Sequence, residues 1–377
     1  MKSLNNPFIT YGYKGAEYFC DRKVETRKMI DALNNERNIT LIAPRRIGKT
    51  GLIHHVFSQI REEQPDVHCI YIDIFATKNL EQLIQLLARN VIGKLDSPTH
   101  TVLRKISEFF INFRPTVTFD ATSGMPTFSL DIAQGQQEQS LQRIFEYLEE
   151  SGKRCYIALD EFQQITDYPE TNTEALLRSY IQFMSNVYFI FAGSQQHMMT
   201  EMFLSAKKPF YQSSQIITLG EIDETAYYEF ASHLFEQEGI NLLKDAFHYL
   251  YESLDGQTWY LQSTMNRMYA IRPEIISQAE VDLSIAELIN EQEVAFENYL
   301  SSLTSNQRDL LIAIANERQV KSPMANTFKR KYHLPAVSSI KMALAALIEK
   351  QMVYKYHDNY IVYDRFFAKW LRDKVLI

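Results

Sequence analysis

Residues 41–52, with the sequence LIAPRRIGKTGL, restrict the fold of this chain more than any other segment. They approach the pattern G-x-x-x-x-G-K-[ST], in which a loop between a strand and a helix holds phosphate with its backbone N–H groups. Gly48, Lys49 and Thr50 match the end of the pattern, and Ala43 replaces its first glycine. That first residue turns the chain and need not touch phosphate, so the substitution weakens the motif without removing it.

The residues on either side supply the strand and the helix that this motif requires. Residues 38–42 (NITLI) are β-branched and apolar, which is typical of a buried strand. After Lys49, apolar residues recur on one helical face at Leu52, Ile53, Val56, Phe57 and Ile60. Another amphipathic helix is expected before the strand, over residues 19–33, with Asp21 as its N-cap.

Four later apolar runs predict further strands of the same sheet. They cover residues 67–75, 154–159, 187–192 and 215–219 and are separated by helical patterns. Near-continuous apolar strands that alternate with helices are typical of a parallel sheet covered on both faces. Alternation on either side of residues 122–124 predicts a β-hairpin inserted at about 113–133. We therefore expect an α/β core of the P-loop NTPase class, resembling AAA+ proteins, over residues 1–220.

Beyond this core the pattern becomes helical. Residues 221–300 predict a helical lid, and residues 301–377 predict three helices followed by two strands that turn at 357–359, the outline of a winged helix. Residues 321–377 carry 11 Lys and Arg against 4 Asp and Glu, a net charge of +7; since the chain totals −7, the remainder carries −14. A basic end on an acidic body indicates an anionic partner or docking onto the body itself.

Polar residues follow two of the predicted strands, at the sheet edge where ligands bind. Asp160 and Glu161 suit a pair in which the first carboxylate holds Mg²⁺ and the second activates the attacking water. Ser194 or Gln195 could sense the γ-phosphate. Taken alone, an Asp-Glu pair after a strand is more often a helix N-terminal cap, and Ser194 or Gln195 is as compatible with an ordinary loop or cap. In combination with the P-loop, they predict binding of a nucleoside triphosphate.

In the P-loop itself, Lys49 is expected to neutralise the β- and γ-phosphates and Thr50 to ligate Mg²⁺. The expected nucleotide contacts in the loop are Ala43, Pro44, Arg45, Arg46, Ile47, Gly48, Lys49, Thr50 and Gly51. The side chains of Arg45 and Arg46 could also neutralise the leaving phosphate, with solvation at the surface as the alternative.

Six short motifs extend along nearly the whole chain. They are F-x-x-R-x-x-E (Phe19, Arg22, Glu25), P-R-R-I-G-K-T (44–50), A-L-D-E (158–161), F-A-G-S (191–194), P-F-Y-Q (209–212) and Y-x-V-Y-D-R-F-F-x-x-W (360–370). In this combination the chain resembles the archaeal-type ATPases, which belong to the STAND branch of the AAA+ superfamily. The resemblance implies a sheet order of 5-1-4-3-2, a helical lid and a winged helix.

The resemblance also implies ATP or ADP with Mg²⁺ as ligands, and it assigns roles to individual residues. It implies phosphate contacts at Gly48, Lys49 and Thr50, Mg²⁺ at Thr50 and Asp160, water activation by Glu161, a first sensor at Ser194 or Gln195, and adenine contacts between Tyr11 and Arg22. In the lid, residues 256–261 resemble a G-x-P segment that closes over the nucleotide, although the proline is missing here.

These observations predict a cytoplasmic switch that binds ATP, hydrolyses it slowly and thereby controls docking of the winged helix to a protein partner. No apolar run approaches the length of a membrane span, and Cys20, Cys69 and Cys155 form no C-x-x-C pair, so neither a membrane protein nor a zinc site is indicated.

Two alternatives stay open: an ATP-controlled DNA-binding regulator, and a pseudo-ATPase with a structural nucleotide. A nucleotide-dependent oligomer is also open. In the segment 337–350, which would be the DNA-reading helix, few side chains other than Lys341 could contact the bases or phosphates of DNA.

Overall fold

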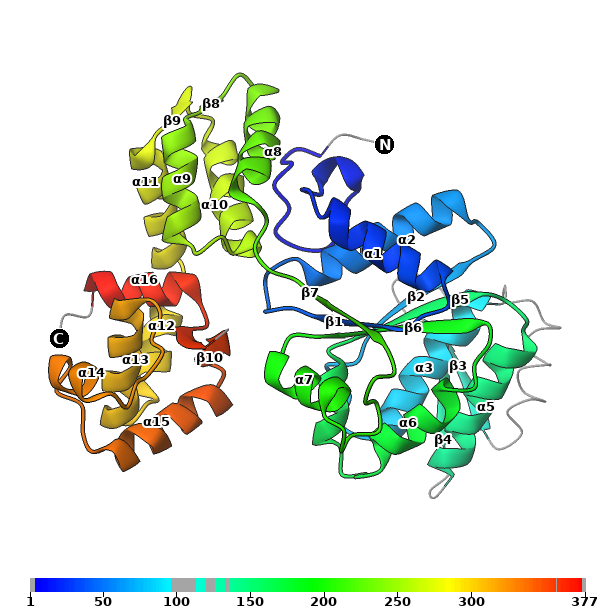
Figure 1. The fold of residues 1–377 in the computed structure, drawn as a ribbon. Coiled ribbons are helices and arrows are strands. Elements are labelled where there is room, and N and C mark those ends of the chain that lie inside the picture. The colour runs from blue at the N-terminus through cyan, green and yellow to red at the C-terminus, as the bar shows by residue number, and fades with distance from the viewer. Residues whose placement is uncertain (1–3, 96–112, 120–125, 133–135, 357, 375–377) are drawn as a thin grey trace. The chain divides into compact units, whose positions relative to one another are not determined.

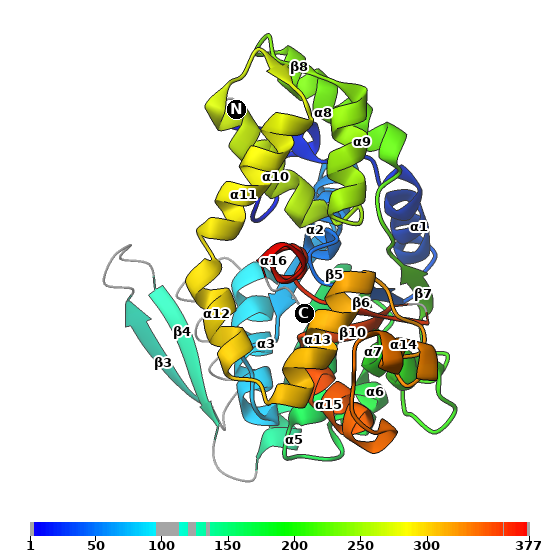
Figure 2. The same ribbon diagram turned by 90° about the vertical axis from the view of Figure 1, so that its left-hand side faces the viewer.

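The computed structural model describes residues 4–95, 113–119, 126–132, 136–356 and 358–374 (Figures 1 and 2). The chain divides into two compact units. One comprises Tyr11–Glu221, and the other combines Met1–Thr10 with Ile222–Ile377. Among the described residues, no helix has both the length and the apolar character needed to span a bilayer.

The unit of residues 11–221 is built on a five-stranded parallel sheet. Its strands are β1 (Ile39–Ile42), β2 (His68–Asp73), β5 (Cys155–Asp160), β6 (Val187–Gly193) and β7 (Gln215–Thr218). The spatial order β2-β5-β6-β1-β7 corresponds to 5-1-4-3-2 when these five are counted along the chain, so the expected order is confirmed. β1 lies between β6 and β7, with Ile42 beside both Gly193 and Thr218, so the P-loop that follows β1 has a neighbouring strand end on each side.

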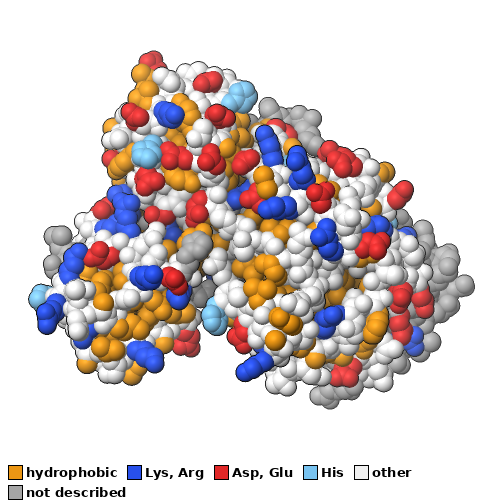
Figure 3. Space-filling model, in the orientation of Figure 1, with side chains coloured by type: hydrophobic (Ala, Val, Ile, Leu, Met, Phe, Trp, Pro, Cys, Tyr) orange, Lys and Arg blue, Asp and Glu red, His pale blue; other side chains and the backbone are white. Residues whose placement is uncertain are grey.

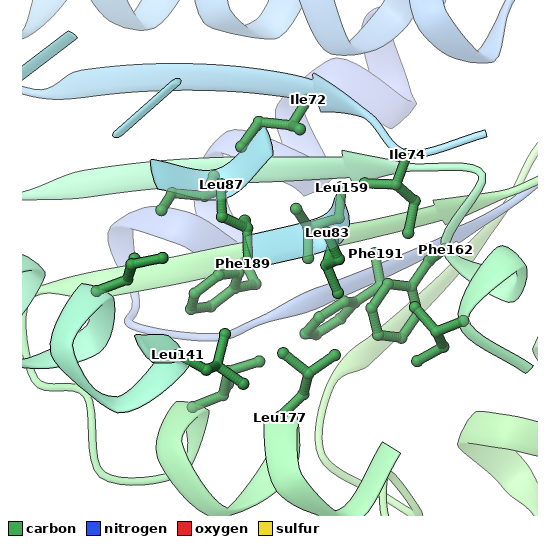
Figure 4. Close-up of a cluster of buried hydrophobic side chains, with 14 of the residues drawn as sticks. Ile72, Ile74, Leu83, Leu87, Leu141, Leu159, Phe162, Leu177, Phe189 and Phe191 are labelled. Carbon is green, nitrogen blue, oxygen red and sulfur yellow. The ribbon is translucent and has the colours of Figure 1, made fainter. Parts of the chain in front are cut away.

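Helices cover both faces of the sheet, because nearly every strand residue is apolar and each strand points alternate side chains to opposite faces. One face is covered by α1 (Lys23–Asn34) and α2 (Lys49–Glu63), and the other by α3 (Leu80–Leu95), α5 (Gln137–Glu150), α6 (Thr173–Ile181) and α7 (Gln196–Leu204) (Figure 1). Figure 4 shows the second interior, where Phe189 and Phe191 of β6 meet Leu83 of α3, Leu177 of α6 and Phe162 of the 3₁₀ segment Phe162–Asp167. This packing fixes the strand ends that carry the polar residues.

The predicted hairpin is present. Strands β3 (Phe113–Phe119) and β4 (Pro126–Ile132) pair antiparallel, with Val117 opposite Phe128. The predicted turn at residues 122–124 lies outside the described residues. β4 lies beside α3, so the insertion adjoins the core without joining its parallel sheet.

The helix expected over residues 19–33 begins at Lys23, and Asp21 is not its N-cap. Asp21 and Arg22 both adopt left-handed backbone conformations, with φ of 52° and 60°. The Arg22 side chain is buried and donates to the carbonyls of Ile47 (3.2 Å) and Gly220 (2.6 Å). Because these bonds fix Arg22 against the core, the chain turns sharply there and the helix starts one residue later.

The other unit contains five helices that follow β7: α8 (Glu224–Glu236), α9 (Lys244–Ser253), α10 (Thr258–Ile271), α11 (Gln278–Asn290) and α12 (Glu293–Ser301). A two-residue parallel pair, β8 (Asn241–Leu242) and β9 (Ile275–Ile276), was not predicted. Residues 4–10 also pack here: Phe8 is fully buried against Phe235 and Tyr269, and the Trp259 indole donates to the Thr10 carbonyl at 2.9 Å. Residues 4–10 therefore belong to this unit and not to the core of residues 1–220 that the sequence analysis predicted.

The same unit ends in a winged helix. Its elements are α13 (Ser305–Glu317), α14 (Asn326–Lys331), α15 (Val337–Glu349), the antiparallel pair β10 (Val353–Tyr356) and β11 (Asn359–Val362), and α16 (Arg365–Lys374). The three helices and the hairpin were predicted, and α16 was not. His357 of the predicted turn lies outside the described residues. α16 joins this domain to α10: Phe366 contacts Tyr260 at a ring distance of 4.9 Å, and Arg365, 3% exposed, pairs with Asp255 at 2.8 Å.

Candidate nucleotide-binding site

The loop between β1 and α2 has the backbone that a phosphate-binding loop requires. Gly48 has φ of 101°, which strains any other residue, and a Cβ placed there would meet no atom within 4 Å. The loop is therefore open at the N-terminus of α2, where backbone N–H groups and the helix dipole favour an anion. Ala43 is buried, its N–H donates to the Gly193 carbonyl at 3.2 Å, and its φ is not positive, so alanine fits this position.

Lys49, Thr50 and Asp160 converge at the first turn of α2. Asp160 ends β5 and is 2% exposed. Its Oδ1 lies 2.5 Å from Lys49 Nζ, and its Oδ2 accepts hydrogen bonds from Thr50 Oγ1 (2.8 Å) and Tyr71 Oη (2.7 Å). The structure thus brings together residues more than 100 positions apart, because β5 and the P-loop end at the same edge of the sheet.

Glu161 follows Asp160 in a left-handed conformation with φ of 56°. Oε1 of its carboxylate accepts from Lys49 Nζ at 2.7 Å, and Oε2 accepts from Ser194 Oγ and Gln163 Nε2, both at 2.6 Å. A non-glycine residue in this conformation is uncommon and persists where surrounding contacts hold it, often at functional sites. Here three donors fix both carboxylate oxygens, which is the positioning that a general base needs.

Electrostatics keep this acidic pair ionised. Burial alone would raise the pKa of Asp160 and of Glu161, but the Lys49 ammonium and the hydrogen bonds that they accept outweigh it, so both pKa values lie below their ordinary ones. The pKa of Tyr71 is raised by burial and by the neighbouring Asp160 carboxylate, so its phenol keeps the proton that it donates. Burial also raises the pKa of Asp73, the residue of β2 that lies opposite Asp160 of β5 in the sheet.

Gly193 and Gln163 support this arrangement from β6 and the 3₁₀ segment. A Cβ at Gly193 would lie 2.5 Å from Gln163 Oε1 and would also collide with Met199. Only glycine fits without moving Gln163, whose amide donates to Glu161. Gln163 and Tyr71 were missed by the sequence analysis, since neither residue belongs to a pattern with a known chemical role.

The donor atoms suit a magnesium nucleotide. Mg²⁺ prefers oxygen ligands and retains several waters. The Thr50 hydroxyl donates a hydrogen bond to the Asp160 carboxylate, so two such ligands already lie side by side. Beside them, the Lys49 ammonium and the open loop at Gly48 could hold the phosphates. The chemistry of these residues therefore fits Mg²⁺ and a triphosphate together.

Other predicted site residues have different surroundings. Arg22 donates to backbone carbonyls of the loop and of Gly220, and Tyr11 is 77% exposed. Gln195 is half-buried at the N-cap of α7, whereas its neighbour Ser194 bonds Glu161. In the loop, Pro44 and Ile47 are buried and Arg46 is exposed, with φ of 66°. Ser194 is thus the residue of the predicted sensor pair that touches the acidic pair.

This parallel sheet, with a phosphate-binding loop after β1 and an acidic pair after β5, defines the P-loop NTPase class. Residues 19–264 match the family model described as an ATPase domain predominantly from Archaea, and residues 294–373 match a probable winged helix domain. Since the first match covers well over half of the chain, the protein belongs to this archaeal ATPase family.

Individual proteins are similar to this chain in sequence or in fold. An uncharacterized ATP-binding protein of Methanocaldococcus jannaschii is 22% identical over 279 residues, which are 67% of this chain and 74% of that protein. The fold is similar to that of the Walker-type ATPase PABY2304 of Pyrococcus abyssi (TM-score 0.66, 18% identity, 97% of this chain and 99% of the other). It is also similar to the Aeropyrum pernix ORC2 protein (TM-score 0.58, 14% identity, 93% and 92%).

Proposed function

We propose that this protein is a cytoplasmic ATP-driven switch of the STAND type, in which the nucleotide state controls docking of the winged helix to a protein partner. In this proposal residues 11–220 form the ATPase core, 221–300 form the lid together with residues 4–10, which pack on it, and 301–377 form the winged helix. The observation that carries it is the convergence of Lys49, Thr50, Asp160 and Glu161 at one edge of the sheet. The family assignment and the ATP-binding relative support ATP as the nucleotide.

Each residue has a defined task in the proposed reaction. The backbone at Gly48 and the Lys49 ammonium bind the phosphates, and the Thr50 hydroxyl and Asp160 carboxylate hold Mg²⁺. When bound, Mg²⁺ neutralises charge on the β- and γ-phosphates. Glu161 accepts a proton from the attacking water, and Ser194 and Gln163 hold its carboxylate in position. Tyr71 and Lys49 keep Asp160 ionised for its role as a ligand.

The surface of the winged helix supports a protein partner over DNA. On α15, Val337, Met342 and Ile348 are 46%, 74% and 41% exposed, with Lys341 between them. Figure 3 shows hydrophobic side chains gathered over the region of α14 and α15, with Lys and Arg around them. Five of the eleven cations after residue 320 already pair with carboxylates: Lys331, Lys355, Arg365, Lys369 and Lys374. Less positive charge is therefore available to phosphates than the sequence suggests.

A nucleotide-dependent increase in thermal stability tests the proposal directly. At 100 times its dissociation constant, a ligand of the folded state adds about 2.7 kcal/mol of stability. With Mg²⁺ we expect ATP and ADP, but not GTP, to raise the melting temperature of the purified, nucleotide-free protein. The Lys49→Ala variant, compared with its own nucleotide-free baseline, should show no shift. If no nucleotide stabilises the wild type, the switch is refuted and the fold is a scaffold.

Binding to duplex DNA separates the switch from a DNA-binding regulator. Fluorescence anisotropy with a labelled duplex, at low and moderate salt and with or without ATP and Mg²⁺, is expected to show only weak binding. A regulator that contacts six to ten phosphates would instead lose roughly 10³ to 10⁵ in affinity between 50 and 200 mM salt. Such a steep dependence, sensitive to nucleotide, would favour the DNA-binding alternative.

A further inference from the structure

Arg45 occupies a defined position in the P-loop rather than a solvated one. Its Nε donates to Ser194 Oγ at 3.2 Å, and its guanidinium lies 5.6 Å from the centre of the Phe75 ring. Ser194 follows β6 and Phe75 follows β2, so the cation lies across the carboxyl ends of the sheet strands. A hydrogen bond and a cation–π contact from two different segments hold it there.

Ser194 connects this guanidinium to Glu161. Its hydroxyl accepts from Arg45 and donates to Glu161 Oε2 at 2.6 Å, while Lys49 donates to the other oxygen, Oε1. The two oxygens of the proposed general base are therefore linked to two different cations of the same loop, one directly and one through a hydroxyl. Arg22, which also lies near the loop, differs because it donates to the carbonyls of Ile47 and Gly220 and pairs with Glu25.

We propose that the Arg45 side chain binds the γ-phosphate and makes the site prefer a nucleoside triphosphate over a diphosphate. This rests on the proposed function. The N-terminus of α2 serves the β-phosphate, which ATP and ADP share, and Lys49 reaches the β- and γ-phosphates together. In-line hydrolysis places the water, and hence its base, beyond the γ-phosphate. A cation fixed next to the base through Ser194 is on the side where the two nucleotides differ.

Arginine suits this task better than lysine. The guanidinium is a planar fork with five N–H donors, and the bond to Ser194 uses the one on Nε. Anchoring through Nε orients the fork before the ligand arrives, which limits the entropy lost on binding. The anchor also links γ-phosphate recognition to the residue that holds Glu161 in position, so the same hydroxyl serves binding and catalysis.

Isothermal titration calorimetry with ADP and with slowly hydrolysed ATPγS, both in excess Mg²⁺, measures the preference. Arg45→Gln is expected to weaken ATPγS about tenfold or more, since a charge-assisted hydrogen bond is lost, and to change ADP binding less than about twofold. Arg45→Lys should retain part of the preference, and Ser194→Ala should reduce it. Arg143→Gln, which removes an arginine from an exposed ion pair on α5, is the matched control and should match the wild type.

The outcomes distinguish this inference from the proposed function. Retained ADP affinity in Arg45→Gln also shows that the variant folds with an intact loop. If both nucleotides weaken equally, if neither changes, or if the wild type binds both equally, Arg45 does not read the γ-phosphate and the inference is wrong. If the wild type binds neither nucleotide, the proposed function itself fails.

Discussion

The Lys49→Met variant is expected to lose about 3 to 5 kcal/mol of stability near pH 8, which is the usual cost of removing one partner from a buried ion pair. The Lys49 ammonium lies 2.5 Å from the Asp160 carboxylate and 2.7 Å from that of Glu161, and all three side chains are largely buried. Without it, two adjacent carboxylates remain buried, and no other cation among the described residues forms an ion pair with them. The remaining hydrogen bonds from Thr50, Tyr71, Ser194 and Gln163 keep the loss within this range.

The same variant is expected to reverse the pH dependence of the stability against unfolding. In the wild type the pKa values of Asp160 and Glu161 are lowered from 3.8 and 4.5, so their contribution is present above these values and is lost as pH falls through the lowered ones. In Lys49→Met, burial is no longer opposed by the ammonium, so both pKa values rise above the ordinary ones. The folded state then binds protons more readily than the unfolded state, and the variant becomes more stable as pH falls from about 8 to about 5.5.

Urea unfolding followed by far-UV circular dichroism measures both effects. Tryptophan fluorescence would report on the wrong part of the chain, since Trp259 and Trp370 both lie within residues 222–377. Lys331→Met, in an exposed ion pair with Glu317, is the control and should show no reversal. Adding Glu161→Gln to Lys49→Met should restore part of the stability. A variant that keeps the wild-type pH profile would show that Lys49 does not set the charge of the acidic pair.

The Glu161→Gln variant is expected to retain ATP binding and to lose hydrolysis by about 10²- to 10⁴-fold, the usual contribution of a general base. Glutamine keeps the shape of the side chain but cannot take a proton from water. It also removes a charge beside Lys49, whose contact with Asp160 at 2.5 Å is retained, so the phosphate-binding loop should stay intact. Phosphate release measured at saturating ATP, together with the thermal shift, separates chemistry from binding.

Asp73→Asn serves as the control for this variant. Asp73 ends β2 and lies opposite Asp160, which ends β5. The Asp73 carboxylate accepts a hydrogen bond from the Phe75 N–H rather than from Lys49. It should therefore retain most of the hydrolysis. A wild type that binds ATP without any hydrolysis would support the pseudo-ATPase alternative, and undiminished hydrolysis in Glu161→Gln would assign the base to another group.

The sequence predicts the parts of the site that depend on strand ends. Lys49, Asp160, Glu161 and Ser194 each follow an apolar run, and parallel strands bring such positions to one edge whatever the loops between them do. Tyr71 could not be predicted in the same way. It lies inside β2, where a tyrosine is as easily a packing residue, and its bond to Asp160 exists only because β2 and β5 are neighbours in the sheet.

The predictions from the sequence were wrong where long-range contacts override local patterns. Residues 19–33 have the periodicity of one helix, but the bonds of Arg22 to Ile47 and Gly220 delay its start to Lys23. Phe8 belongs to a segment without periodicity, which is held by packing on α8 and α10 and by hydrogen bonds to α10. The residues that Arg22 and Phe8 contact are distant from them in the chain, so no local pattern could have indicated these contacts.

The ion pair between Arg365 and Asp255 has a consequence for any attempt to transplant the C-terminal domain. A fragment restricted to residues 294–373 would take Arg365 away from Asp255, Phe366 away from Trp259 and Tyr260, and Trp370 away from Glu293. A guanidinium that is 3% exposed in the intact protein would lose its counter-ion, beside newly exposed aromatic surface. The winged helix is therefore not an interchangeable module, and a chimera with another ATPase would have to carry α9 and α10 with it.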